Sequence, residues 1–168
     1  MLDLPQSPLV KGGGDRWGDL IIFKPRLLMT HFHLTNSPIL PPDWIAPLRH
    51  PQAGALATFE GWVRNHNQGH PVTALTYEVY PELALKEGER ILQEALAQFD
   101  LHQAIAVHRY GNLAIGDIAV WIGTTASHRR AAFAGTQYII DEIKTRLPIW
   151  KQEFYGDRPC RWVYCRDH

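Results

Sequence analysis

The sequence predicts an α+β fold in which a mainly antiparallel sheet carries its helices on one face. Strand-like and helix-like stretches follow one another in the order β-β-α-β-β-α-β. Both helical stretches are amphipathic rather than wholly apolar, so each has one side to pack on a sheet and one side for water. Together these two observations indicate a sandwich of one sheet layer and one helix layer.

The first two predicted strands form a hairpin. Residues 55–63 alternate apolar and polar side chains, and residues 72–80 resume with β-branched and aromatic ones. The connection and its flanks read WVRNHNQGHPV, with Gly69 as the expected pivot. This short stretch holds one arginine, two histidines, two asparagines and one glutamine between apolar runs.

The first predicted helix begins at Pro81, because proline suits the first turn of a helix. Its apolar face holds Ala84, Ile91, Ala95 and Phe99. Residues 103–110 and 117–125 then predict two more strands, joined by a turn that carries Gly111 and Gly116. The near-continuous apolar run of the second is typical of a central strand buried on both faces.

The second predicted helix begins after Ser127, which can cap it, and runs to about Arg146. It ends there because the residue before Pro148 avoids the α region. Its expected core residues are Phe133, Ile140, Ile143 and Leu147. A last strand, residues 160–166, completes the predicted order.

Length and composition limit the classes of function. A chain of 168 residues suits one compact core, so we expect a single domain over residues 30–168. Residues 1–29 sustain no period and predict a disordered or peripheral extension, whereas THFHLTNSPI after Met29 alternates like a strand. Lysine plus arginine and aspartate plus glutamate number 17 each, so no overall field favours nucleic acid or an anionic membrane. Any anion site must therefore be local.

The cysteines and the apolar runs bear on the compartment. Cys160 and Cys165 match neither a zinc spacing nor a C-x-x-C pair, and we interpret them as reduced packing residues of the last strand. No apolar run approaches the ~20 residues of a membrane-spanning helix, and the N-terminus lacks the order of a signal peptide. These features predict a cytoplasmic protein.

Three polar clusters could carry chemistry. The first, Arg64 to Asn67 at a strand end, is either a solvent-exposed hairpin tip or the edge of an anion-binding pocket. The second, SHRR at residues 127–130, places basic side chains in the first turn of a helix, where the macrodipole disfavours cations. Either a phosphate offsets that cost, or the arginines pair with surface carboxylates.

The third cluster, Asp141 to Glu153, contains Lys144 and Lys151. Lys144 lies in the last helical turn, where a cation is favoured in any case. Lysines that lie close together and are partly buried become usable as acids, bases or nucleophiles near neutral pH. Pro148 breaks the helical register between them, so the spacing leaves their proximity open.

Other chemistries find no support in the sequence. No dinucleotide-binding, Walker, nucleophile-elbow or zinc-protease pattern is present. The histidines of the core region show no metal-ligand spacing, and we expect no metal site. His108 lies within an apolar strand, and we interpret it as a core residue with satisfied hydrogen bonds.

The three clusters together resemble the catalytic (large) subunit family of molybdopterin synthase. The resemblance rests on FEGWVRNHN, SHRRAAF and, most specifically, DEIKTRLPIWKQE, and covers roughly Phe32 to Val163. It implies an α/β hammerhead fold and a homodimer that binds one small ubiquitin-like subunit at each end, forming a heterotetramer. It implies sulfur transfer from that subunit's C-terminal Gly-Gly thiocarboxylate to cyclic pyranopterin monophosphate. The product is the dithiolene of molybdopterin, and no metal or other cofactor is needed in this step.

The resemblance also implies the residues of the site. Lys144 and Lys151 would be catalytic, the first at the thiocarboxylate and the second orienting the pterin and assisting proton transfer. An anion-gripping set would consist of Arg64, His128 and Arg129. The other positions that match the family's pocket are Trp62, Val63, Gln152 and Glu153. Because both subunits of the dimer contribute pocket residues in this family, Arg64 or His128 would serve either its own or the neighbouring lysines.

A non-catalytic binding module is the alternative. In it, the same basic cluster would hold a phosphorylated ligand or a protein C-terminus. The presence of both Lys144 and Lys151 favours the enzyme, because a pure binder need not keep both. A nucleic-acid role is the weakest hypothesis, given the balanced charge and the lack of a basic stripe.

Overall fold

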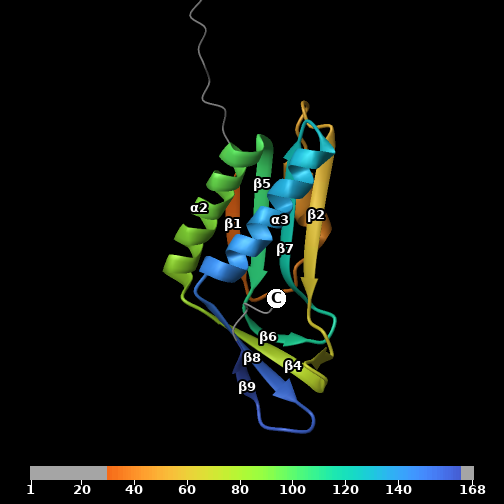
Figure 1. The fold of residues 1–168 in the computed structure, drawn as a ribbon, viewed down its shortest axis with the longest axis vertical. Helices are drawn as coiled ribbons and strands as arrows, with labels where there is room; N and C mark the ends of the chain where they lie inside the picture. Colours follow the sequence, from red (N-terminus) through yellow and green to blue (C-terminus); the bar gives the residue numbers. More distant parts are fainter. Residues whose placement is uncertain (1–29, 164–168) are drawn as a thin grey trace, which may run out of the picture.

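Two sheets that meet near the C-terminal end of a long helix make up the fold (Figure 1). The computed structural model describes residues 30–163. In the larger sheet β1 pairs with β5 in parallel, and the remaining pairs are antiparallel. Its strands, in spatial order, are β1 (Thr30–Thr35), β5 (Leu101–Arg109), β7 (Ile118–Ala126) and β2 (Ala55–Trp62).

The smaller sheet is built around β4 (His70–Val79), which lies between two neighbours. On one side it pairs with β6 (Gly111–Ala114) and on the other with β8 (Ile149–Tyr155), both antiparallel. The edges are β3 (His66–Asn67), which closes the hairpin onto β4, and β9 (Arg161–Val163), which pairs with β8. Gly69 has a φ of 81°, as its place at the hairpin tip requires.

Both long helices, α2 (Pro81–Phe99) and α3 (Arg129–Arg146), pack on one face of the larger sheet (Figure 1). α2 approaches the sheet closely at Gly88, where a Cβ would lie 2.2 Å from the ring of Phe32. The buried stripe of α2 consists of Ala84, Gly88, Ile91, Leu92, Ala95 and Leu96. These residues follow the 3.6-residue period that predicted the helix.

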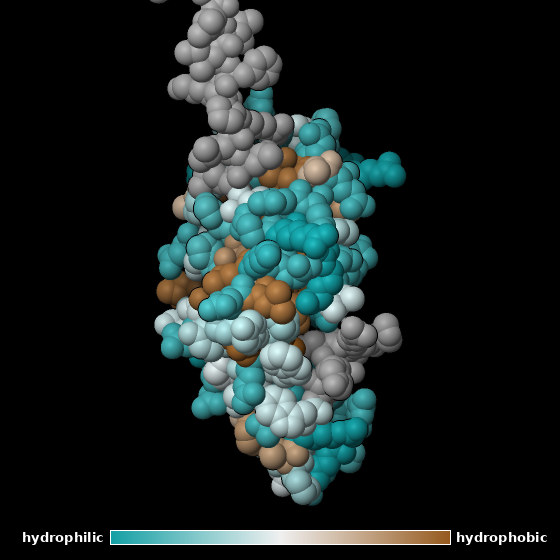
Figure 2. Space-filling model, turned by 90° about the vertical axis from the view of Figure 1, so that its left-hand side faces the viewer, coloured by the Kyte–Doolittle hydropathy of each residue, from teal (hydrophilic) through white to brown (hydrophobic). Residues whose placement is uncertain are grey.

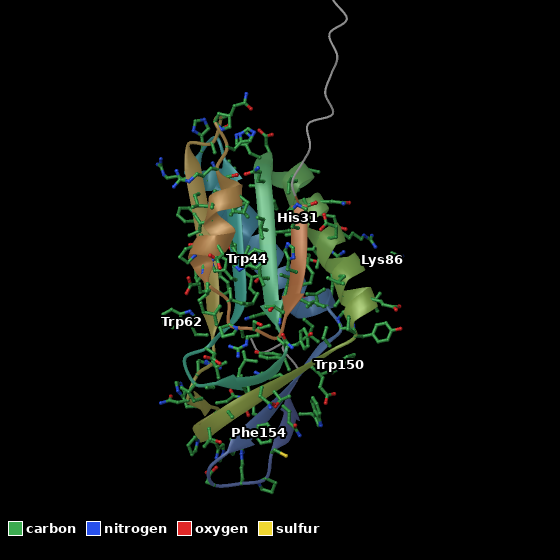
Figure 3. The ribbon with its side chains drawn as sticks, turned by 180° about the vertical axis from the view of Figure 1, so that it is seen from behind. His31, Trp44, Trp62, Lys86, Trp150 and Phe154 are labelled. Carbon is green, nitrogen blue, oxygen red and sulfur yellow. The ribbon has the colours of Figure 1, made fainter. Side chains whose placement is uncertain are left out.

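The opposite face of the larger sheet is covered in part by α1 (Pro41–Ile45) and the 3-10 turn Ala46–Leu48. Trp44 of α1 lies over this face in Figure 3, and Leu48 packs there with the fully buried Trp121. Figure 2 views the molecule from the side of α2, where apolar residues interrupt a hydrophilic surface near mid-height. None of the helices in residues 30–163 is long and apolar enough to cross a membrane.

The predicted fold class is confirmed, with both long helices on one face of a mainly antiparallel sheet. Each of the predicted strands and helices is present, and the strand expected after Met29 is β1. The structure adds four short elements and one important strand, β8, which the sequence analysis did not predict. The last predicted strand is present as β9 over Arg161–Val163, and the rest of its predicted range after Val163, like residues 1–29, lies outside the described part of the chain.

Four local expectations were wrong. Residues 55–63 and 72–80 do not pair as a hairpin, because the chain leaves the larger sheet after Trp62: β2 pairs with β7, and the hairpin around Gly69 is formed by β3 and β4. Phe133 is 65% exposed, because small residues form the stripe that meets the sheet at this end of α3 and Phe133 lies beside it. Ser127 does not cap the helix; its hydroxyl lies 3.0 Å from Nε2 of His102, and His128 is the N-cap residue. Cys160 is exposed and precedes β9 rather than packing within it, while Cys165 lies outside the described residues.

A candidate active site between the two sheets

A cavity of about 390 Å³ opens between the larger and smaller sheets, beneath the C-terminal end of α3. The larger sheet lines it with residues of β2, β5 and β7, and the smaller sheet with residues of β4 and β8. From the two sheets come Phe59, Gly61, Trp62, Leu75, Tyr77, His108, Ala119, Val120, Ile149, Lys151 and Glu153. The rest of the lining is Ile140, Ile143, Lys144 and Leu147 at the end of α3, with Arg64 and His66 at the hairpin.

Strand β8 supplies the polar wall of the cavity. Successive side chains of a strand point to opposite faces of its sheet, so Lys151 and Glu153 share one face and Gln152 takes the other. Gln152 accordingly donates to Sγ of Cys160 at 3.5 Å and does not line the cavity. On that outer face Trp150 and Phe154 are exposed (Figure 3).

Both candidate lysines line the same cavity. Lys144 comes from the last turn of α3, and Lys151 follows on β8 after the chain turns at Pro148. Lys144 is exposed, whereas the Lys151 side chain retains 12% of its accessible surface. The question that the sequence left open is therefore answered: the turn brings the two lysines to one site.

Glu153 anchors Lys151. Its carboxylate is 3% exposed and lies 3.1 Å from Nζ of Lys151. The other carboxylate oxygen accepts hydrogen bonds from Nδ2 of Asn67, at 2.9 Å, and from the hydroxyl of Tyr155. Burial alone would raise the pKa of Glu153, but the bonds from Tyr155, Asn67 and Lys151 outweigh burial and hold that pKa below its usual value. Glu153 therefore stays charged and fixes the position of the Lys151 ammonium.

The connection from β2 to β3 places Arg64 at the cavity but turns its neighbour Val63 away. Val63 does not line the cavity; it is buried in an apolar cluster with Leu75 and Ala119, and its N–H donates to the carbonyl of Asp117 at 3.0 Å. Trp62 lines the cavity while 64% exposed, and its indole N–H donates to Glu60 at 2.8 Å. Of this predicted group, Trp62 and Arg64 face the site, and Val63 packs behind it.

His128 and Arg129 lie at the opposite end of α3 from the cavity. The helix has 18 residues, so at 1.5 Å per residue its two ends are about 27 Å apart. Both residues are exposed, and neither lines the cavity of its own chain. The second polar cluster is thus separated from the other two by the length of one helix.

His108 is the lining residue whose role the sequence did not reveal. It is buried, as expected, and Nδ1 donates to the carbonyl of Arg109 at 2.9 Å. Burial lowers its pKa to about 4 despite that hydrogen bond, which raises it, so the ring is neutral at neutral pH. It also lines the cavity, which an apolar strand pattern does not disclose because the pattern marks burial, not the space beside it.

The charged groups of the cavity favour an anionic ligand. Arg64, Lys144 and Lys151 supply positive charge, and the negative charge of Glu153 is engaged by Lys151. Arg64 and Lys144 are exposed, whereas Lys151 is largely buried and attracts a phosphate or a carboxylate more strongly, because its surroundings screen its charge less. Within residues 30–163, no group of three or more histidine, cysteine or acidic side chains is arranged to hold a metal ion.

Comparison with known proteins gives consistent results. The model of the MoaE protein family matches residues 34–146. The molybdopterin synthase catalytic subunit of Thermoplasma volcanium is 38% identical over 136 residues, 81% of this chain and 99% of that protein. The corresponding protein of Escherichia coli K12 is 43% identical over 126 residues, 74% of this chain and 81% of its own length.

Solved structures agree with the sequence comparisons. The crystal structure of molybdopterin synthase from Staphylococcus aureus superposes with a TM-score of 0.75 at 32% identity, covering 80% of this chain and 98% of that one. The molybdopterin cofactor biosynthesis protein E of Burkholderia multivorans gives a TM-score of 0.70 at 35% identity, covering 83% and 90%. With its fold, its matched core and its cationic cavity, the chain belongs to the MoaE family of molybdopterin synthase catalytic subunits.

Proposed function

We propose that this protein transfers two sulfur atoms to cyclic pyranopterin monophosphate, one from the C-terminal thiocarboxylate of each of two small ubiquitin-like subunits. Water releases each small subunit as a carboxylate, and the two sulfur atoms form the dithiolene of molybdopterin. The observation that carries the proposal is the meeting of Lys144, Lys151 and Arg64 at one cavity between the sheets. The cavity volume, about 390 Å³, is within the range of small-molecule sites. The relatives named as catalytic subunits of this enzyme support the same reaction.

In the proposed reaction the two lysines have different tasks. Lys144 is exposed at the mouth of the cavity and meets the incoming thiocarboxylate, where its charge stabilises the negative charge that develops during transfer. Lys151 is held by Glu153 and delivers or accepts a proton at a fixed position beside the pterin. Arg64 holds the phosphate of the substrate.

A small sulfur-carrier subunit is the proposed partner. One chain of a solved protein–protein complex of subunits 1 and 2 of the molybdopterin-converting factor from Helicobacter pylori has the same fold as this chain, with a TM-score of 0.63 at 17% identity. A flexible Gly-Gly tail is slim enough to enter a cavity between two sheets. We further propose that the enzyme acts in the cytoplasm, where an exposed free thiol such as that of Cys160 remains reduced.

We also propose that the active form is a homodimer, bound to two small subunits as a heterotetramer. His128 and Arg129 are exposed about one helix length from the cavity of their own chain. A second copy would bring them to its neighbour's Lys144 and Lys151, where they would add to the grip on the phosphate. In this arrangement the bound phosphate would offset the unfavourable interaction between these basic residues and the helix dipole.

Reconstitution of the reaction tests the proposal. The purified protein, the thiocarboxylated small subunit and cyclic pyranopterin monophosphate are mixed, and molybdopterin is measured, with Lys144→Ala assayed in parallel. We expect product from the parent protein and at least a hundredfold slower formation in the variant. No product from the parent, while it still binds the small subunit, would instead favour the binding module.

A further inference from the structure

A ligand in the cavity also needs side chains that accept hydrogen bonds from it. Lysine and arginine side chains can only donate hydrogen bonds, so Arg64, Lys144 and Lys151 suit phosphate and carbonyl oxygens. The carboxylate of Glu153 is occupied by Lys151 and by two donors from neighbouring side chains. A heterocycle with ring N–H groups needs acceptors as well as donors, and these must come from elsewhere in the lining.

His108 offers such an acceptor. The residue is 6% exposed, lines the cavity, and meets the ring of Tyr77 edge to face at 5.1 Å between centroids. Because Nδ1 donates to the carbonyl of Arg109, the hydrogen of the neutral ring is on Nδ1 and the lone pair is on Nε2. Within residues 30–163, Nε2 has no hydrogen-bond partner.

We propose that Nε2 of His108 accepts a hydrogen bond from a ring N–H or amino group of the substrate, which makes His108 a substrate-binding residue that selects a pterin. This inference rests on the proposed function, since it assumes that the ligand of the cavity is a phosphorylated pterin. The cationic side chains hold the phosphate, and His108 recognises the heterocycle. A buried acceptor rejects ligands without a matching donor, because it is then left unpaired away from water.

A pair of substitutions separates this role from simple packing. In His108→Asn the side-chain amide reproduces Nδ1 and its bond to Arg109, but no atom replaces Nε2. In His108→Gln the longer side chain carries an amide oxygen to the position of Nε2. We expect the KM for the pterin to rise about tenfold in His108→Asn and to return to within about threefold of the parent in His108→Gln, with kcat little changed. Inhibition by inorganic phosphate should be equal in all three proteins, because phosphate contacts only the cations.

The substrate can be varied in place of the protein, which keeps the test decisive if a variant fails to fold. A pterin phosphate methylated at its ring N–H positions should bind the parent about tenfold more weakly than the unmethylated ligand, measured by titration calorimetry. His108→Asn should discriminate between the two ligands less than the parent does. Equal KM values in parent and His108→Asn, or undiminished binding of the methylated ligand by the parent, would overturn the inference.

The failure of this inference and that of the proposed function are distinguishable. If the parent makes molybdopterin and His108→Asn has the parent's KM, sulfur transfer stands and the role of His108 is refuted. If the parent makes no product, calorimetry with the pterin still decides whether His108 contributes to binding. A fall in kcat and melting temperature that is equal in the Asn and Gln variants, with unchanged KM, would identify a purely structural residue and overturn the inference.

Discussion

The two ends of α3 differ in how much of a site each one forms. At the C-terminal end, Lys144 joins Lys151, anchored by Glu153, in a cavity with walls from both sheets. At the N-terminal end, His128 and Arg129 are exposed, and the helix dipole opposes their charge. The difference teaches that one helix can carry a cluster of basic residues at its N-terminal end that its own fold keeps away from the cationic cavity at its C-terminal end. In the proposed homodimer, a second subunit would bring the two ends together.

Removal of Lys151 should have the largest effect. Lys151→Ala deletes the ammonium and leaves the buried Glu153 without its cation, so we expect sulfur transfer to slow by about 10²- to 10³-fold in a single-turnover assay. Lys86→Ala is the matched control, since Lys86 is exposed on α2 away from the cavity (Figure 3). A Lys151→Ala rate above a tenth of the parent rate would show that Lys151 has no catalytic role.

The N-terminal end of α3 is tested by mixing two defective subunits. Arg129→Ala alone should slow the reaction by about 30-fold, because it removes one charged contact to the phosphate. Heterodimers of Arg129→Ala and Lys144→Ala subunits, isolated with two affinity tags, should recover about half the parent rate, since one of their two sites is intact if the ends of α3 meet across subunits. Heterodimers as slow as the separate variants would place all site residues within one chain.

A smaller effect is expected from substitution of Glu153, which fixes Lys151 in the cavity at the C-terminal end of α3. Glu153→Gln keeps the shape and most hydrogen bonds of the side chain but removes the charge that fixes Lys151. We expect kcat to fall about tenfold, with unchanged affinity for the small subunit. Asn67→Ala should act in the same direction and more weakly, because two of the three partners of Glu153 remain. A kcat equal to the parent's in Glu153→Gln would show that the ion pair is dispensable.

The smallest effect concerns the attachment of α3 to α2. Arg146 donates to Glu87 at 2.7 Å and pairs with Glu94 and Glu142. Arg146→Met removes these contacts and should lower the free energy of unfolding by about 1 kcal/mol, measured by urea titration. Arg90→Met is the control; it breaks the more exposed pair with Glu94 and should change stability by less than about 0.5 kcal/mol.

This stabilisation depends on pH in a defined direction. Hydrogen bonding from Arg146 lowers the pKa of Glu94 to about 2 from a usual 4.5. A carboxyl whose folded pKa is depressed stabilises the protein above its unfolded pKa, and that contribution is lost as pH falls toward the folded pKa. The stability difference between the parent and Arg146→Met should therefore shrink between pH 4.5 and 2. A difference that is constant over this range would contradict the assignment.

Much of the fold follows from local pattern, and β8 shows where pattern fails. The helices α2 and α3 and the strands β2 and β4, which lie in different sheets, have apolar residues on the inward face, as the usual rule assumes. In β8 the inward face carries Lys151 and Glu153, while Trp150 and Phe154 point outward. The usual order is reversed because the strand lines a polar cavity, so hydropathy alone does not identify it.

The candidate site was predictable in part for similar reasons. Sequence clusters identified Arg64, Lys144 and Lys151, which the structure brings together. The family resemblance also implied Val63 and Gln152, whose side chains face away because they neighbour lining residues on extended chain. His108 could not be assigned to the cavity, since burial in a strand does not reveal which space the ring borders.

The alternation of β8 also constrains the length of the chain. Pro148 and the end of α3 fix where the strand begins, and β4 fixes its pairing, with Lys151 opposite Tyr77. Deleting one residue between Pro148 and Lys151 would turn every following side chain over, bringing Gln152 to the cavity and sending Lys151 out. This connection therefore tolerates changes of residue type far better than changes of length, and natural variants should conserve its residue count more strictly than its composition.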